Sequence, residues 1–385
     1  MKLYLLEPDV PGARWAPFAG VRPIAELRAG AFLIRDRWRR LLNADPAGVI
    51  SPATPRFADV GSLPVVDRAS VVGPAIVARS TFAPIGMDLA LPPGVTALTA
   101  GGATVAWLLA PGQPWTGPEA AMDGFEIRGM PLDQTADLIG ACERLLEDDC
   151  ASFRDDVGDT VPAGCVVLGD PSGLVVRTAS VEPHVVFDVR KGPIVLEADS
   201  VVRAGTRLEG PLYVGSHSWL LGGAIRHSVI GPHCRVHGEL ATSVLLGFAN
   251  KSHDGFVGHS IIGQWANLGA GTITSNLKNT YGPIRLESPN GRLETGRSLL
   301  GSLIGDHAKI GIGTLLSTGT VIGAGASVLA GRLSRFLKPF LWDQNQALTL
   351  DGFLTVARRV MPRRGVEVTA EIEASLGAIH GRLAQ

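Results

Sequence analysis

The sequence has little of what marks secreted, membrane-spanning or nucleic-acid-binding proteins. Its four cysteines lie far apart with no CxxC pair, which favours reduced thiols in a cytoplasmic protein over a disulfide framework. No apolar run approaches the roughly 18 residues that a membrane helix needs. The formal net charge is only -1, and no long basic stretch is present. We therefore expect no membrane insertion and no nucleic-acid partner.

Tyrosine is also scarce, whereas glycine is abundant and follows a repeat. Aliphatic residues recur every six positions, and glycine directly follows many of them. The repeating positions are Val202, Leu208, Val214, Leu220, then Ile230, Val236, then Ile262, Leu268, and finally Ile304, Ile310, Leu316, Ile322 and Val328. A hexapeptide period predicts a left-handed parallel β-helix, in which each hexad supplies one short strand and one corner. Each coil then buries its apolar residues against its neighbours.

The repeat divides the chain into three predicted parts. Residues 1–182 alternate strand-like and helical patterns and predict an α/β domain. Residues 183–333 form the β-helix, and residues 334–385 predict a helical tail with Thr369 as an N-cap. Residues 278–298 abandon the period, and S-P-N-G between two strand-like runs predicts a hairpin arm there.

The N-terminal domain offers two arginines as candidate nucleotide ligands. A buried strand over Lys2–Glu7 is followed by a loop and a helix, an order in which α/β domains hold phosphates. Arg22 and Arg28 lie near the helix start, where guanidinium groups would grip a polyphosphate bidentately. The alternative is that both are surface arginines beside a helix.

Two groups of residues suggest metal binding without defining a site. Four aspartates follow a predicted helix and would either hold Mg²⁺ or line a solvated loop: Asp148, Asp149, Asp155 and Asp156. The second group is a set of histidines, with His253 and His259 six residues apart, which raises the alternative of a zinc site shared between subunits. No metal ligand is assigned.

The clearest candidate for catalysis is His253. From Leu246 to Val257 the repeat is interrupted by polar residues, which indicates a local loop kept for its side chains. An imidazole there would accept a proton from an attacking amine or hydroxyl. Lys251 would hold a phosphate, and Asn267 and Asn276 would orient a sugar or a thioester carbonyl, although asparagine also serves as a structural corner residue.

Two segments of the β-helix carry a resemblance to a known family. K-S-H-D-G-F-V-G from Lys251 and N-L-G-A-G-T-I-T-S-N from Asn267 resemble the acetyltransferase half of GlmU, a bifunctional sugar-1-phosphate nucleotidylyltransferase and acetyltransferase. The resemblance implies that His253 deprotonates the amine of an amino-sugar-1-phosphate. It also implies acetyl-CoA as co-substrate, a backbone contact from Ala330 to the CoA arm, and a homotrimer with clefts between subunits.

The resemblance further implies that the N-terminal half is a nucleotidyltransferase-like domain, which would couple the product to a nucleoside triphosphate with Mg²⁺ and give a sugar nucleotide like UDP-N-acetylglucosamine. The chain departs from the family at several positions. Phe256 and Leu277 replace tyrosines, and Ala241 stands where a lysine grips the sugar phosphate, so that Lys251 or Lys278 would substitute. The glycine-rich phosphate loop is missing after the first strand. The alternatives are that only one half is active, or that the chain is a non-enzymatic scaffold that binds sugar nucleotides.

Overall fold

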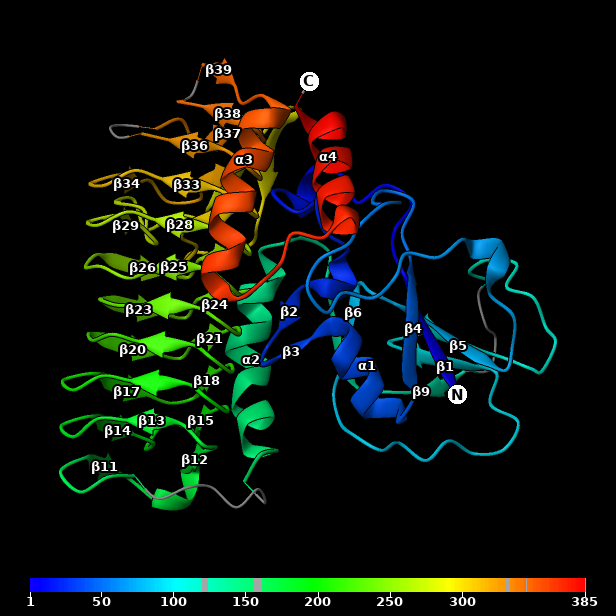
Figure 1. Ribbon diagram of the computed structural model, residues 1–385. Coiled ribbons are helices and arrows are strands. Elements are labelled where there is room, and N and C mark those ends of the chain that lie inside the picture. Colours follow the sequence, from blue (N-terminus) through cyan, green and yellow to red (C-terminus); the bar gives the residue numbers. More distant parts are fainter. Residues whose placement is uncertain (120–123, 155–160, 330–332, 344, 385) are drawn as a thin grey trace.

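The computed structural model describes residues 1–119, 124–154, 161–329, 333–343 and 345–384. It confirms a mixed-sheet N-terminal domain, a parallel solenoid of the left-handed β-helix class and a helical tail. Figure 1 shows the stacked solenoid strands on one side, the N-terminal domain on the other, and α2 (Asp137–Ala151) upright between them. Among the described residues, no helix combines the length and apolar character needed to cross a bilayer.

The N-terminal domain is built on a six-stranded sheet in the order β4-β1-β5-β8-β7-β9. Its strands are β1 (Lys2–Leu6), β4 (Asp45–Ile50), β5 (Ala75–Arg79), β7 (Ala97–Ala100), β8 (Ala103–Leu109) and β9 (Phe125–Glu126). β1 runs parallel to β4 and β5, and β8 runs antiparallel to both β5 and β7. The smaller elements are the pairs β2 (Arg28–Ala29) with β3 (Phe32–Leu33) and β6 (Phe82–Pro84) with β10 (Gly129–Pro131), helix α1 (Ile34–Leu42), and the 3₁₀ turns η1 (Ala13–Trp15), η2 (Ile24–Glu26) and η3 (Arg68–Ser70).

The solenoid is a three-sided prism, and we number its faces in chain order. Face one contains β11 (Val166–Leu168), β14 (Val186–Asp188), β17 (Arg207–Glu209), β20 (Ala224–Arg226), β23 (Glu239–Ala241) and β26 (Phe256–Gly258), and β29 (Ile273–Thr274) and β34 (Leu315–Leu316) continue it. Face two contains β12 (Leu174–Val176), β15 (Ile194–Leu196), β18 (Leu212–Val214), β21 (Val229–Ile230), β24 (Val244–Leu245), β27 (Ile261–Ile262), β32 (Leu303–Ile304), β35 (Val321–Ile322) and β37 (Phe336–Leu337). Face three contains β13 (Ser180–Val181), β16 (Val201–Val202), β19 (Trp219–Leu220), β22 (Arg235–Val236), β25 (Asn250–Lys251), β28 (Asn267–Leu268), β33 (Lys309–Ile310), β36 (Ser327–Val328), β38 (Leu341–Trp342) and β39 (Gln346–Ala347), and η4 (Pro171–Gly173) precedes β12.

The repeat residues form the solenoid core, as their spacing predicts, and all of them are buried. Parallel pairing already begins at Val166, ahead of the expected boundary at residue 183, and it continues to Trp342. The structure corrects one point within the repeat. Leu245, Lys251 and Val257 continue the six-residue period without a break, and Lys251 pairs in register with Val236. The apparent interruption arose because one inward position is a lysine.

The hairpin arm is also confirmed, with β30 (Arg285–Ser288) antiparallel to β31 (Gly291–Glu294). The arm does not stand free of the molecule. Its base residues Ile284 and Leu286 are buried in the core shared with the N-terminal domain. Arg297, just after the arm, donates to the Glu143 carboxylate of α2 over 2.6 Å. The arm therefore helps to hold α2 against the solenoid.

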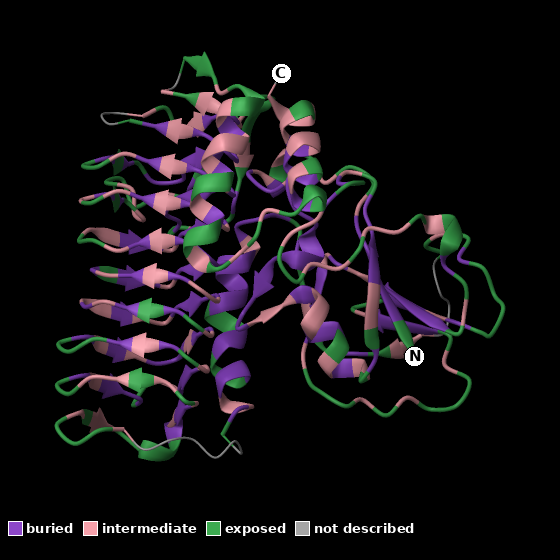
Figure 2. Cartoon of the chain, viewed as in Figure 1, coloured by how far each residue is buried: buried purple, intermediate pink, exposed green. Residues whose placement is uncertain are grey.

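The outer side of face two is covered by the N-terminal domain. Val229, Val244 and Ile261 point outward from this face and belong to the same apolar cluster as Leu138 and Leu145 of α2. Figure 2 shows this contact as a continuous band of buried residues, while the turns at the far side of the solenoid are exposed. Face two is consequently unavailable to other partners, whereas much of face one stays open.

The tail packs where faces two and three meet. Its helices are α3 (Leu350–Val360) and α4 (Ala370–Leu383), joined by η5 (Met361–Arg364), and the predicted cap is present because the amide of Ile372 donates to the Thr369 hydroxyl. A column of rings follows this corner from coil to coil: His217, His233, Phe248, Trp265 and His307. Each ring residue has a positive φ, and Phe353 of α3 packs edge-on against His307. We call this set the aromatic column.

Candidate functional site

His253 lies at the corner between faces three and one, in the turn that joins β25 to β26. The residue is exposed, and no hydrogen bond of its imidazole is found among the described residues. The ring is therefore free to accept a proton from a bound molecule. A general base requires access to substrate, and the exposure of His253 allows that access, while the catalytic role itself stays a prediction.

Lys251 does not lie on the surface as expected for a phosphate ligand. Its side chain is 3% exposed, and its ammonium donates to the carbonyl of His253 and, over 3.1 Å, to that of His237. Burial lowers the pKa of Lys251 to about 8. Because both partners are corner carbonyls, the lysine fastens the backbone of the corner that presents His253.

On face one, the ring of Phe256 and the amide of Asn276 lie together at Gly258, the end of β26 that is farther from His253. A Cβ at Gly258 would come within 2.3 Å of the Phe256 ring and 2.9 Å of Asn276 Nδ2, so only glycine allows both groups to lie against the strand. Asn276 Nδ2 and His259 Nδ1 are 2.8 Å apart. The structure thus brings Asn276 and Phe256 to the face that begins at His253.

The other predicted residues of the solenoid site do not converge on this face. Asn267 lies on face three, where its Oδ1 accepts a hydrogen bond of 2.8 Å from Asn250. Lys278 donates to the carbonyl of Pro283 within the arm. Ala330 lies outside the described residues. A single chain therefore does not assemble His253, Asn276 and Asn267 around one ligand.

Face one carries an exposed apolar strip beside His253. Ile273 and Leu315 are in-register partners in the coils that follow Phe256, and they are 42% and 62% exposed. Ile312, at the corner between faces three and one, is 71% exposed. We call these three residues with Phe256 the face-one strip. Contiguous apolar surface of this kind marks a place where another surface packs.

In the N-terminal domain, the loop after β1 is filled by the chain itself. The Glu7 carboxylate accepts hydrogen bonds from the amides of Ile24 and Ala25, over 2.8 and 3.0 Å. Burial raises the pKa of Glu7 to about 7. The position that a phosphate would take after the first strand is therefore occupied by a buried side chain.

The two arginines predicted to bind nucleotide are buried in internal contacts. Arg22 pairs with Asp59 over 2.5 Å and with Asp306 of the solenoid over 2.8 Å. Arg28 donates to the carbonyls of Ala31 and Leu246 over 2.6 and 3.3 Å. Neither guanidinium is free for a polyphosphate, so this arrangement speaks against the expected role. Both residues instead join the N-terminal domain to the solenoid.

This domain also has a large cavity elsewhere, which no sequence motif had indicated. It has a volume of about 860 Å³ and lies where the parallel strands β5, β7 and β9 end, at Arg79, Ala100 and Glu126. Ligands of α/β domains commonly bind at the carboxyl ends of strands. Arg128 and Asp133 add charge to its wall. These residues come from separate segments with no fixed spacing, which is why sequence reasoning missed them.

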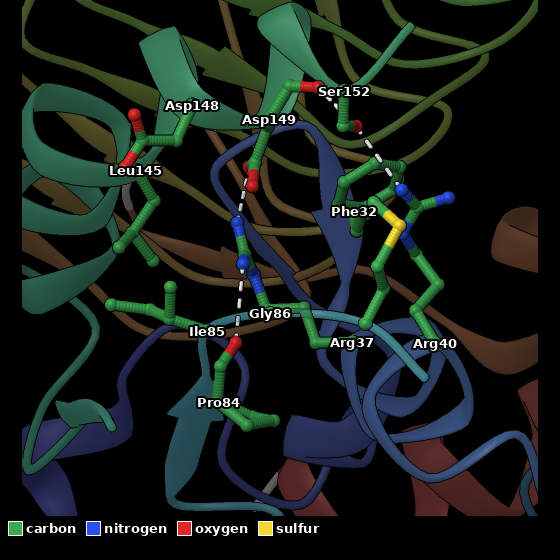
Figure 3. A pocket seen from close by; sticks show the side chains of 11 residues that line it. Phe32, Arg37, Arg40, Pro84, Ile85, Gly86, Leu145, Asp148, Asp149 and Ser152 are labelled. Carbon is green, nitrogen blue, oxygen red and sulfur yellow. Dashed lines mark hydrogen bonds and ion pairs between the residues drawn. The ribbon is translucent and has the colours of Figure 1, made fainter. Parts of the chain in front are cut away.

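A smaller cavity of about 150 Å³ lies between α1 and α2 (Figure 3). Two of the four aspartates that the sequence suggested as Mg²⁺ ligands line it. Asp149 is buried there and pairs with Arg37, whose Nε also donates to the carbonyl of Ala29. Asp148 lies at the rim, while Asp155 and Asp156 fall outside the described residues. Within the described part of the chain, no three histidine, cysteine, aspartate or glutamate side chains group as metal ligands.

The fold defines a class of protein: a left-handed β-helix with an exposed corner histidine, joined to a mixed α/β domain. No protein-family profile matches the chain. It is 30% identical over 149 residues to a bifunctional sugar-1-phosphate nucleotidylyltransferase/acetyltransferase of Sulfurisphaera tokodaii, covering 37% of this chain and 36% of that protein. It is 35% identical over 98 residues to the bifunctional protein GlmU of Methanocaldococcus jannaschii, covering 24% of each.

A longer match joins the chain to the bifunctional protein GlmU of Bartonella quintana. The two are 26% identical over 234 residues, which is 55% of this chain and 45% of that protein. The chain thus matches less than half the length of each of these relatives. The resemblance seen in the sequence is confirmed as a similarity to bifunctional transferases, and the activity of the whole chain is a matter for proposal.

Proposed function

We propose that the chain is a bifunctional enzyme that acetylates an amino-sugar-1-phosphate and couples the product to a nucleotide, giving a sugar nucleotide like UDP-N-acetylglucosamine. The observation that carries the proposal is the exposed imidazole of His253, which has no hydrogen-bond partner among the described residues and lies beside the face-one strip. The names of the relatives support both reactions. We also propose that the protein works in the cytoplasm, because the four cysteines of the chain are unpaired, which suits a reducing compartment.

In the acetyl transfer, the sugar amine attacks the thioester carbon of acetyl-CoA. His253 accepts the proton that the amine loses as the carbon–nitrogen bond forms. The carbon–sulfur bond then breaks, and the proton passes from the imidazolium to the departing thiolate of CoA. Asn276, beside Phe256, would donate to the carbonyl oxygen as its negative charge develops. No covalent enzyme intermediate is required.

The active unit is proposed to be a homotrimer. His253 and Asn276 belong to face one and its corner, whereas Asn267 belongs to face three. Residues on two faces of one prism meet around a single ligand only when another copy contributes its own face. The face-one strip supplies the apolar surface for that contact.

The test is an assay with acetyl-CoA, glucosamine-1-phosphate and UTP, in which thiol release and pyrophosphate release are read separately. His253→Ala should lower the rate of thiol release by at least about 100-fold and leave pyrophosphate release unchanged. His217→Ala, at an exposed position of another corner, is the matched control. Equal loss of both activities in the His253 variant would refute separate sites.

We place nucleotidyl transfer in the 860 Å³ cavity, with Arg79 and Arg128 toward the phosphates. Mg²⁺ typically binds one or two carboxylates together with substrate phosphates, and Glu126 and Asp133 fit that requirement. When bound, the ion would neutralise charge on the triphosphate. Arg128→Ala should reduce pyrophosphate release, whereas Arg144→Ala, on the exposed side of α2, should not.

A second candidate function is acetyl transfer alone, with the N-terminal domain serving for assembly. The observation that favours it is Glu7, whose carboxylate fills the phosphate position after β1. The same assay decides between the two. Thiol release without any pyrophosphate release, with UTP or the other nucleoside triphosphates, would establish the single activity.

A further inference from the structure

The smaller cavity of the N-terminal domain, which we call the α1–α2 cavity, is used by neither of the activities proposed above (Figure 3). Its volume of about 150 Å³ has room for a group of about six carbon atoms. Of its lining residues, only Ile85 also lines the 860 Å³ cavity. Its walls are largely apolar and are formed by Phe32, Pro84, Ile85, Met87 and Leu145.

A buried carboxylate of α2 keeps one oxygen free in this cavity. Asp149 Oδ2 accepts hydrogen bonds from Arg37 and, over 2.9 Å, from the amide of Ala31. Asp149 Oδ1 accepts none from any described residue, although the side chain is only 8% exposed. Gly30 lies so close to the ion pair that a Cβ there would come within 2.2 Å of Asp149 Oδ2. One oxygen thus holds the carboxylate in place, and the other is open to a donor from a ligand.

The end of α2 favours a cation at this place. Backbone carbonyls at the C-terminus of a helix carry partial negative charge, which basic residues of the last turn commonly balance. The last turn of α2 has no basic residue, and Asp148 and Asp149 add negative charge to it. Arg37 balances Asp149, whereas Asp148 forms no ion pair within the described part of the chain. An ammonium group in the cavity would therefore meet negative charge from the helix end and from both carboxylates.

The α1 side of the cavity presents an arginine that forms no ion pair with any described residue. Arg40 donates to the Ser152 hydroxyl over 3.1 Å, and its guanidinium lies over the Phe32 ring, 4.2 Å from the ring centre. The Ser152 hydroxyl in turn donates to the carbonyl of Asp149 over 2.7 Å, which keeps the guanidinium near the end of α2. Burial raises the pKa of Asp149, and the charges of Arg37 and Arg40 counteract that rise. The remaining N–H groups of Arg40 are available to a carboxylate of a ligand.

We propose that the α1–α2 cavity binds a small apolar amino acid. The ammonium group of this ligand donates to Asp149 Oδ1, and its carboxylate accepts from Arg40. Its side chain packs against Ile85 and Leu145. A free carboxylate oxygen and an unpaired guanidinium, with apolar walls around them, match the two opposite charges of an amino acid. A purely anionic ligand does not fit, because Asp148 and Asp149 would repel it.

The experiment is isothermal titration of the full-length chain with leucine and with two analogues that each lack one of its charges. Isopentylamine has no carboxylate, and isocaproate has no ammonium group. Leucine should bind, and each analogue should bind at least tenfold more weakly. Arg40→Met should weaken leucine binding at least tenfold but leave the affinity for isopentylamine unchanged, because that amine lacks the group that Arg40 holds.

The matched control is Arg39→Met, which alters an exposed arginine of α1 outside the cavity and should bind leucine like the native chain. Arg128→Ala, in the 860 Å³ cavity, should also leave leucine binding unchanged. Asp149→Asn should weaken the binding of leucine and isopentylamine alike. If Asp149→Asn does not fold, Asp148→Asn takes its place at an exposed position of the cavity, with the neighbouring Glu147→Gln as its control.

Three results would each overturn the proposal. The first is that neither leucine nor the smaller valine binds. The second is equal affinity for leucine in the native chain and in Arg40→Met. The third is that isopentylamine or isocaproate binds as tightly as leucine, since one of the two charged contacts would then contribute nothing. Because leucine is not a substrate of either proposed reaction and binding is read without turnover, the outcome is independent of both activities.

Discussion

At the scale of single residues, Lys251 occupies a position that neighbouring coils give to apolar side chains. Its register partner is Val236, and Leu268 takes the same position in the next coil. The long apolar stem of lysine fills that position, while its ammonium reaches the corner carbonyls. Burial removes water from the charged ammonium, which disfavours the charged form and lowers the pKa of Lys251 to about 8.

Lys251→Met should change the dependence of stability on pH. The ordinary pKa of lysine is 10.5, so between pH 8 and 10.5 the unfolded chain binds this proton more tightly than the folded chain does. Relative to the variant, the free energy of unfolding of the native chain should therefore rise by up to about 3 kcal/mol across that interval. Urea denaturation at several pH values measures it.

The comparison with the variant isolates Lys251, because the half-buried Lys309, whose pKa is likewise lowered to about 8, is present in both proteins. Parallel curves of unfolding free energy against pH would show that the ammonium of Lys251 is well solvated. If Lys251→Met also releases thiol more slowly while its stability is unchanged, the corner that carries His253 depends on the contact with Lys251.

The roles of individual residues were only partly predictable from the sequence. His253 could be identified because its polar neighbours stand out in a regular repeat. The burial of Arg22 and Arg28 could not, because their partners Asp306 and Leu246 lie more than 200 positions away. Lys251 was misjudged because a charged side chain at an inward position looks like an interruption of the repeat.

At the scale of elements, one buried charge network joins the N-terminal domain to the solenoid. Arg22 pairs with Asp59 of its own domain and with Asp306 of the solenoid, and the side chains of all three are at most 10% exposed. The amide of Gln264 completes the bonding of Asp306. The methionine of η5 and the apolar face of α4 line the same place, so the tail covers the network.

Arg22→Met should destabilise the protein by about 3–5 kcal/mol, because it leaves two buried carboxylates without a counter-charge. Arg68→Met removes an exposed ion pair with Asp9 and should cost less than about 1 kcal/mol. Guanidinium denaturation measures both. Adding Asp306→Asn to Arg22→Met should recover part of the loss. If Arg22→Met and Arg68→Met lower the free energy of unfolding by similar amounts, water reaches the Arg22 network.

The solenoid and the arm were predictable because both follow local rules. A six-residue period fixes which side chains face inward, and S-P-N-G fixes a hairpin. The cavity at the carboxyl ends of β5, β7 and β9 was not predictable, since it depends on which strands become neighbours in a sheet.

At the scale of the whole molecule, the faces of the solenoid have different surroundings. The N-terminal domain covers face two, and the tail covers part of face three. Face one is left with its exposed apolar strip. Face one and the part of face three outside the tail are therefore the faces available to other copies of the chain.

Leu315→Glu should prevent assembly, because it introduces a charge into a surface that must lose water on contact. Light scattering after size exclusion should show the native chain at about three times its 40.4 kDa and the variant at a single chain mass. Val10→Glu, which alters an exposed valine of the N-terminal domain, should assemble normally. A native chain that runs as a monomer would contradict the trimer.

The aromatic column provides a spectroscopic signal for the position of the tail. Trp265 is stacked on Phe248 with ring centroids 4.2 Å apart, and the edge of Phe353 from the tail reaches the same column through His307. Closely stacked rings held in a fixed asymmetric arrangement absorb left- and right-handed circularly polarised light unequally. Departure of the tail would loosen that arrangement, so the near-ultraviolet dichroism of the native chain serves as an unlabelled gauge of whether the tail is seated.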